Sequence, residues 1–277
     1  MKANRFSYVL PDPGSYSGWR DFDADLAVMK QHGYDAVELQ IADPAQLDEA
    51  RLRRSLDAVG YPMCAFQTGG SYATHGNCLC TSDDGVRRRT IDLMRRFVDL
   101  AARWQSTIVF GSLQGRLKDE PDPAAGGQRI ADALMEIGRH ATRKGVTMAL
   151  EPVNRLEVGF HNTIAEAAQL VRRLNLAGLR LMVDTYHMSI EEEDMVAPLA
   201  EVSDLLAHVH LSETHRDVLG TGRCDTAALL RELGRLAYSG YCSIGVYGSR
   251  LPRHQCISRS MEALRKAMAA LRKSMEE

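Results

Sequence analysis

The sequence predicts an α/β fold in which eight strand–helix units close into a (β/α)8 barrel, with residues 1–277 forming a single domain. Eight short apolar runs recur along the chain, rich in β-branched or aromatic residues as buried parallel strands are. The segments between them carry helical periodicity, and eight such units in about 250 residues are typical of a TIM barrel. A doubly wound sheet is disfavoured, because PDPGSYSGW after the first run lacks the GxGxxG turn.

The eight expected strands, in chain order, are 6–10, 35–40, 62–67, 106–111, 146–151, 179–184, 205–212 and 241–247. Several of these strands end with polar side chains.

Helical stripes support the alternation of strands and helices. Between 91 and 102 the apolar residues fall on one helical face, and from 257 to 271 they step by three or four positions. Asp83 and Asp84 precede one expected helix and Asp225 precedes another, as N-terminal capping residues do.

Charge and composition exclude several classes of function. The 34 basic and 36 acidic residues give a net charge of −2, which argues against a nucleic-acid footprint. No apolar segment approaches the length of a membrane span, so we expect a soluble, cytoplasmic protein without a membrane partner. Six cysteines without a CxxC pair predict reduced thiols rather than a structural zinc site.

The ends of the strands carry a group of acidic and histidine residues. Glu38 lies near the end of the second expected strand, and Glu151, Asp184 and His210 end the fifth, sixth and seventh. Active sites of these barrels lie at the carboxyl ends of the strands. An ordinary salt bridge would explain any one of these residues alone. Three on successive strands predict a site for a divalent ion such as Mn, Mg, Co or Zn.

Further polar residues follow the same strand ends and suit a polyhydroxylated ligand. They are Arg155 and Glu157 after the fifth strand, His187 after the sixth, and Glu213, His215 and Arg216 after the seventh.

Three ordered motifs resemble the xylose-isomerase-like sugar isomerase/epimerase superfamily, and within it the ketose 3-epimerases of the D-tagatose and D-psicose type. They are EPVNR, VDTYHMSIEEED and HVHLSETHRDVLGTG. The resemblance implies an isomerase in which Glu151, Asp184 and His210 bind a divalent ion, manganese first, and Glu151 also serves as acid/base. It implies a homodimer or homotetramer as well.

The same resemblance implies roles for the neighbouring residues and a mechanism. His187 and Arg216 would hold oxygens of a small-molecule sugar, and Glu157 would bind a hydroxyl. A carbon acid beside a ketone loses its proton when a metal stabilises the enediolate. A carboxylate on each face of the enediolate then permits inversion.

Gly245 departs from the family pattern. The family's fourth metal ligand and second acid/base is a glutamate at the end of the eighth strand, where this chain has Ser243-Ile244-Gly245-Val246. Alternation along a strand places Gly245 on the same face as Ser243. The glycine keeps the fold assignment and puts the activity in question, whether it is native or introduced.

Four interpretations of Gly245 stay open. A bulge could let Glu213, Tyr247 or His254 supply the missing ligand. The chain could be an epimerase impaired by Gly245, which we place first. It could be a one-base isomerase or lyase acting on a keto-sugar or keto-glycoside, or a non-catalytic barrel that binds a sugar or metal.

Two further alternatives are weaker. An endonuclease IV-like enzyme would need more histidine ligands and a basic surface. A sugar phosphate could bind at Gly220-Thr221-Gly222, but glycine pairs in loops usually form turns.

Overall fold

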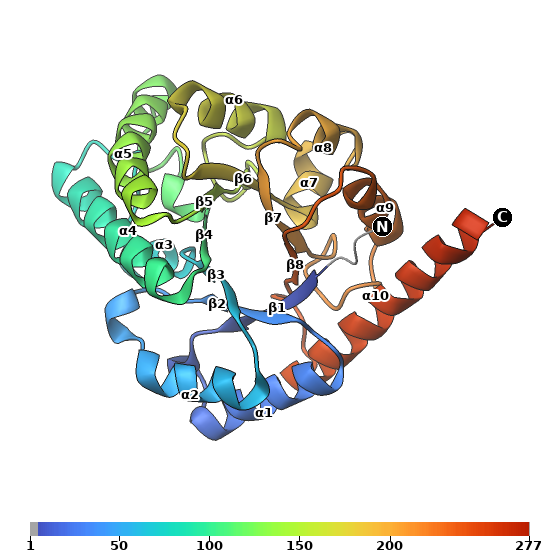
Figure 1. The fold of residues 1–277 in the computed structure, drawn as a ribbon. Coiled ribbons are helices and arrows are strands. Elements are labelled where there is room, and N and C mark those ends of the chain that lie inside the picture. Colours follow the sequence, from blue (N-terminus) through green and yellow to red (C-terminus); the bar gives the residue numbers. More distant parts are fainter. Residues whose placement is uncertain (1–4, 277) are drawn as a thin grey trace.

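The computed structural model describes residues 5–276 as a closed barrel of eight parallel strands, which confirms the predicted fold class (Figure 1). Each strand pairs with its neighbours in the chain, and β1 pairs with β8 to close the barrel. The strands are β1 (Arg5–Pro11), β2 (Ala36–Gln40), β3 (Met63–Gln67), β4 (Thr107–Phe110), β5 (Met148–Leu150), β6 (Leu179–Asp184), β7 (Leu206–Leu211) and β8 (Tyr241–Ile244).

Four strands end earlier than the sequence predicts: β4 and β7 by one residue each, and also β5 and β8. Strand β5 ends at Leu150, so Glu151 is the first residue beyond it. Strand β8 ends at Ile244, and the predicted extension to residue 247 is wrong. Strand β7 ends at Leu211, so the last register pair between β7 and β8 is Leu211 with Ile244. Gly245 therefore begins the loop that leads into the last helix.

Long helices surround the barrel and present apolar stripes to it (Figure 1). Asp83 and Asp225 each accept a backbone N–H at the start of a helix, as predicted. The main helices are α1 (Trp19–Gln31), α2 (Glu49–Val59), α4 (Asp84–Trp104), α5 (Pro123–Lys144), α6 (Ile164–Leu174), α9 (Thr226–Arg235) and α10 (Arg253–Glu276).

Short helices occupy loops that the sequence did not mark as helical. They are the 3-10 turns η1 (Pro13–Ser15), η2 (Pro44–Gln46) and η3 (Ser112–Gln114), with α3 (Gly70–His75), α7 (Thr185–Glu191) and α8 (Ala197–Glu201). Five of them directly follow β1, β2, β3, β4 and β6, so they build up the carboxyl-terminal face of the barrel.

Part of the barrel interior is filled by apolar residues that lie below polar ones. A separate cluster of buried residues includes Ala36, Ala65 and Met182. Each lies two positions before a polar residue, namely Glu38, Gln67 and Asp184, so that both share the inward face of a strand. These strands therefore carry their apolar residues below and their functional groups at the mouth.

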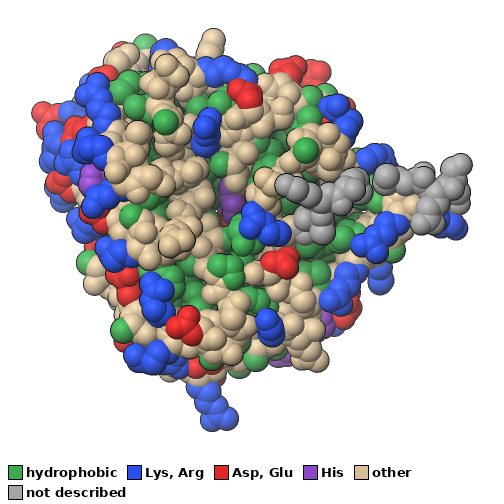
Figure 2. All heavy atoms as spheres, viewed as in Figure 1, with side chains coloured by type: hydrophobic (Ala, Val, Ile, Leu, Met, Phe, Trp, Pro, Cys, Tyr) green, Lys and Arg blue, Asp and Glu red, His purple; other side chains and the backbone are tan. Residues whose placement is uncertain are grey.

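The surface agrees with the balanced composition. Figure 2 shows one face of the molecule, on which basic and acidic side chains are interspersed rather than gathered by sign. Within the part of the chain that the structure describes, no helix has the length and apolar character needed to cross a membrane.

Candidate active site at the carboxyl ends of the strands

Three strand ends bring Glu151, Asp184 and His210 together. Asp184 and His210 are register partners on the adjacent strands β6 and β7. The backbone N–H of Glu151 donates to the carbonyl of Phe110 at 2.9 Å, which continues the β4–β5 ladder by one residue. The three side chains thus come from neighbouring strands at one end of the barrel.

The distances among these three groups fit a cation. His210 Nδ1 lies 3.6 Å from Asp184 Oδ2 and 3.8 Å from Glu151 Oε1. All three ligand atoms fall within 4.8 Å of one another. Ligands at about 2.1 Å from a metal are separated by roughly 3–4 Å. Two carboxylates and one imidazole at this spacing therefore fit a divalent ion.

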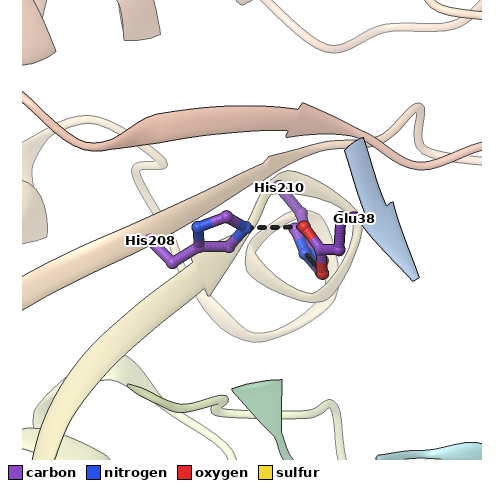
Figure 3. A group of neighbouring side chains, drawn as sticks. All are labelled: Glu38, His208 and His210. Carbon is purple, nitrogen blue, oxygen red and sulfur yellow. Dashed lines mark hydrogen bonds and ion pairs between the residues drawn. The ribbon is translucent and has the colours of Figure 1, made fainter. Parts of the chain in front are cut away.

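Glu38 on β2 ties the two histidines of β7 together inside the barrel. Its carboxylate lies 2.7 Å from His208 Nε2 and 2.9 Å from His210 Nε2, and Figure 3 shows both imidazoles directed at it. Both histidines and Glu38 are buried. The bond to Glu38 leaves His210 Nδ1 free to face Asp184 and Glu151, an arrangement common around metal-ligating histidines.

Glu38, His208 and His210 form a second group that could hold a metal, and His210 belongs to both groups. The atoms of this second group are already in hydrogen-bonding contact, because 2.7 and 2.9 Å are ordinary hydrogen-bond lengths. A metal would have to separate them. The geometry favours the group of Glu151, Asp184 and His210, with Glu38 as the partner that orients His210.

The two carboxylates of the first group differ in their electrostatics. Burial raises the pKa of Glu151, and the opposing charges of His187 and His210 do not cancel this effect. Burial also acts to raise the pKa of Asp184. There the adjacent His210, with the charges of His187 and Arg216, outweighs burial and holds the pKa below its usual range. Asp184 is therefore the more readily ionised of the two.

His187, Arg216 and Glu157 line the same cavity, which has a volume of about 260 Å³. His187 Nδ1 accepts the backbone N–H of Asn154 at 3.2 Å, and its Nε2 lies 3.2 Å from Arg216 Nη2 and 3.7 Å from Glu151 Oε1. Arg216 Nη2 lies 3.3 Å from Glu157 Oε1. Its guanidinium stacks on the ring of Tyr186 at 3.9 Å from the centroid.

Three polar residues suggested by the sequence, Arg155, Glu213 and His215, do not line the cavity, and His215 is exposed. Arg155 pairs with Glu191 on α7 and does not line the cavity. The buried Glu213 carboxylate accepts the backbone N–H of Gly220 at 2.7 Å and that of Cys224 at 3.3 Å. It stabilises the loop after β7 and is not directed at the metal group, so the expectation that it could supply the missing ligand is not supported.

The Tyr247 side chain occupies the space next to Gly245. A Cβ atom added at Gly245 would lie 2.7 Å from Tyr247 Cε2 and 2.9 Å from Ser212 Oγ. The hydroxyl of Ser212 donates to Asp184 Oδ2 at 3.3 Å, so a side chain at position 245 would point toward the site. Desolvation of the Tyr247 hydroxyl, with the charges of Asp184 and Glu38, raises its pKa well above the usual value.

Gln67 at the end of β3 connects Tyr247 with His210. Its amide nitrogen lies 3.0 Å from the Tyr247 hydroxyl and 3.4 Å from His210 Nε2. Gln67 and Asn154 are not among the site residues predicted from the sequence, although Gln67 ends the expected strand 62–67 and Asn154 lies within EPVNR. Gln67 could have been predicted as a site residue because it is a polar residue at the end of an expected strand.

Comparison with known proteins identifies the family of this chain. Residues 26–272 match the family described as xylose isomerase-like TIM barrel. A ketose 3-epimerase of Arthrobacter globiformis is 34% identical over 216 residues, which cover 76% of this chain and 72% of the relative.

Solved structures share the fold over nearly the whole chain. A structure of L-ribulose 3-epimerase superposes with a TM-score of 0.86 at 22% identity, covering 99% of this chain and 97% of that one. A D-allulose 3-epimerase from Methylomonas sp. in complex with D-allulose gives a TM-score of 0.79 at 22% identity, covering 99% and 98%. With the family match over 26–272 and these sugar epimerase relatives, the chain belongs to the xylose isomerase-like TIM barrel family, in its ketose 3-epimerase branch.

Proposed function

We propose that this chain is a divalent-metal-dependent sugar epimerase of the ketose 3-epimerase type, acting on a carbon next to a ketone. One observation carries the proposal: Glu151, Asp184 and His210 converge within 4.8 Å at the wall of a cavity of about 260 Å³. The named activities of the relatives, which are epimerisations of ketoses, support a ketose as the substrate.

Glu151, Asp184 and His210 would hold the metal, with manganese the first expectation and Mg, Co or Zn as alternatives. When bound, the ion supplies Lewis-acid stabilisation of negative charge on the oxygens beside the reacting carbon. The donor set of two carboxylates and one imidazole suits any of these ions. The bond from His210 to Glu38 fixes the ring so that Nδ1 is the available ligand atom.

The residues of the cavity divide the remaining work. Glu151 removes the proton from carbon, and its raised pKa suits a group that must accept and return a proton. His187 and the Arg216 guanidinium hold substrate oxygens. Glu157, placed by Arg216 and by the side-chain amide of Asn154, accepts a substrate hydroxyl.

The absence of a side chain at Gly245 lowers the rate at which the substrate's carbon is inverted. The position from which a second carboxylate would act carries no side chain, so a pair of carboxylates cannot serve both faces of the substrate. We therefore expect proton removal and return on the Glu151 side to be faster than inversion. This is the sense in which the chain is an impaired epimerase.

The absence of a side chain at Gly245 also favours a second candidate, one-base chemistry. A single carboxylate can move a proton on one face, as in an isomerase, or remove one for β-elimination in a lyase. Substrates would be keto-sugars or the bulkier keto-glycosides. If no proton transfer occurs, the chain is instead a non-catalytic barrel that binds a sugar or a metal.

Solvent exchange tests the proposed function directly. The metal-free protein is reloaded with Mn²⁺ and incubated in D₂O with D-allulose or L-ribulose, and NMR measures deuterium at the carbon next to the ketone. We expect exchange that requires the metal and that falls by about 10²–10⁴-fold in Glu151→Gln, because the base is lost.

The matched control for this experiment is Glu157→Gln, which should raise KM more than it lowers kcat. Exchange that persists without metal, or at an undiminished rate in Glu151→Gln, would contradict the proposal. Products with a new double bond would identify lyase chemistry instead.

A further inference from the structure

Tyr247 fills the volume into which a strand-8 carboxylate would extend. Its Cε2 lies 2.7 Å and its hydroxyl oxygen 3.2 Å from the position that a Cβ atom would take at Gly245. A side chain at position 245 and the present Tyr247 side chain therefore exclude one another. The glycine does not leave a gap at the site, because an aromatic residue two positions later occupies it.

The Tyr247 hydroxyl is held toward the site. Gln67 approaches it with its amide nitrogen at 3.0 Å and its carbonyl oxygen at 3.3 Å. The Arg216 guanidinium lies 5.0 Å from the centroid of the Tyr247 ring. The side chain is 38% exposed and lines the cavity, so a bound molecule can touch it.

Tyr247 and Glu151 face the cavity from different sides. Glu151 follows β5, whereas Tyr247 follows β8, which is three strands further round the eight-stranded barrel. Both residues line the cavity that also contains His187 and Arg216. A molecule bound between them would present one face to a carboxylate and the other to a phenol.

We propose that Tyr247 is the second acid/base of this site and carries the inversion that Gly245 would otherwise prevent. This role rests on the proposed function. Glu151 takes a proton from carbon on one face, and the Tyr247 hydroxyl delivers its own proton to the same carbon on the opposite face. The C–H bond is remade with inverted configuration, leaving protonated Glu151 and a phenolate, and solvent water restores both groups.

The chemistry of a phenol explains why Tyr247 and Glu151 would transfer protons at different rates. A neutral phenol can donate a proton, whereas a phenolate forms much less readily than a carboxylate near neutral pH. The Arg216 guanidinium near the ring provides positive charge next to the phenolate that forms. Inversion through Tyr247 is therefore slower than exchange through Glu151.

Tyr247→Phe separates the two proton transfers, because it removes the hydroxyl and keeps the ring. In D₂O with D-allulose or L-ribulose, we expect inversion to fall by about 10²-fold or more while exchange at the same carbon persists. Mn²⁺ affinity, measured by calorimetry, should not change. Tyr61→Phe, two residues before the start of β3 and therefore at the opposite end of the barrel, is the matched control and should leave both rates unchanged.

Two further variants test the shared volume. Tyr247→Ala should behave as Tyr247→Phe does. Adding Gly245→Glu to Tyr247→Ala provides a carboxylate together with the space for it, and should restore inversion. Gly245→Glu alone should restore less, because Tyr247 obstructs it.

The outcomes distinguish this role from the proposed function. Undiminished inversion in Tyr247→Phe, or exchange without any inversion in the unmodified protein, would overturn the role of Tyr247 and leave the proposed function standing. A loss of exchange together with inversion in Tyr247→Phe would also overturn it. Absence of exchange in the unmodified protein would contradict the proposed function and, with it, this role.

Discussion

The lack of a side chain at Gly245 permits the present position of the Tyr247 ring. The Tyr247 ring lies 2.7 Å from where a Cβ at Gly245 would be, a separation that real Cβ contacts do not show. Ser212 closes the other side at 2.9 Å and is fixed by hydrogen bonds to Thr185 and Asp184. At the scale of single residues, the glycine permits the present packing of Tyr247 and Ser212 as well as being chemically silent.

Gly245→Ala should destabilise the fold by about 1–3 kcal/mol, because the added methyl overpacks the site. Urea unfolding measures the change, and the loss should shrink in a Tyr247→Ala background. Gly127→Ala on α5 is the control: nothing lies within 4 Å of its added Cβ, so it should be neutral or stabilising by up to about 1 kcal/mol. Equal losses in both backgrounds would show that Tyr247 does not fill the space.

Strands β2 and β7 are linked across the barrel interior at the scale of elements. They are not neighbours in the sheet, since β1 and β8 lie between them. The Glu38 carboxylate joins them through His208 and His210. The strand β6 adds Asp184, which also caps α7 by accepting the backbone N–H of Tyr186 at 2.8 Å. The ends of these elements are thus fixed by the residues that form the site.

Two substitutions should distinguish the two candidate metal groups that share His210. Asp184→Asn keeps a good cap for α7 but removes a charged ligand. It should weaken Mn²⁺ binding by more than the roughly 10–100-fold that is typical of losing a residue that hydrogen-bonds to a metal ligand. His208→Gln keeps a hydrogen-bond partner for Glu38 and should weaken binding by no more than that. Calorimetric titration gives both affinities, and the reverse order would place the metal at Glu38, His208 and His210.

The closed barrel joins the two ends of the chain at the scale of the whole molecule. Strand β1 pairs with β8, and α10 packs against α1 and α9 (Figure 1). All the site residues therefore depend on closure of one ring of strands. Loops on its carboxyl face leave Leu117 and Leu156 exposed, with Leu156 74% exposed.

We expect the assembled protein to be a homodimer or homotetramer. Light scattering coupled to size-exclusion chromatography should give a mass about two or four times the 30.7 kDa of the chain. Leu156→Glu should lower that mass if the exposed leucine lies in the interface. A single-chain mass for the unmodified protein would contradict this expectation.

The sequence predicts the barrel well because its signals are local and repeated. The stripe from Ile257 to Leu271 became the packed face of α10, and the eight apolar runs became the eight strands. The convergence of Glu151, Asp184 and His210 followed from barrel topology. The position of Tyr247 could not be predicted, because it depends on where β8 ends and on which side chains fill the mouth. The role of Glu38 similarly depends on contacts between strands that are not adjacent.

His210 belongs with one ring nitrogen to the barrel core and with the other to the site. A ligand that binds the site therefore interacts with a residue whose other bond holds two strands together. A ligand that binds only the folded state stabilises it by RT ln(1 + [L]/Kd), so the melting temperature rises with ligand affinity and concentration. Thermal-shift screening of metal salts and ketoses against this chain can consequently identify its ligands without any assay of the reaction. Loss of that response in Asp184→Asn would assign the shift to the site.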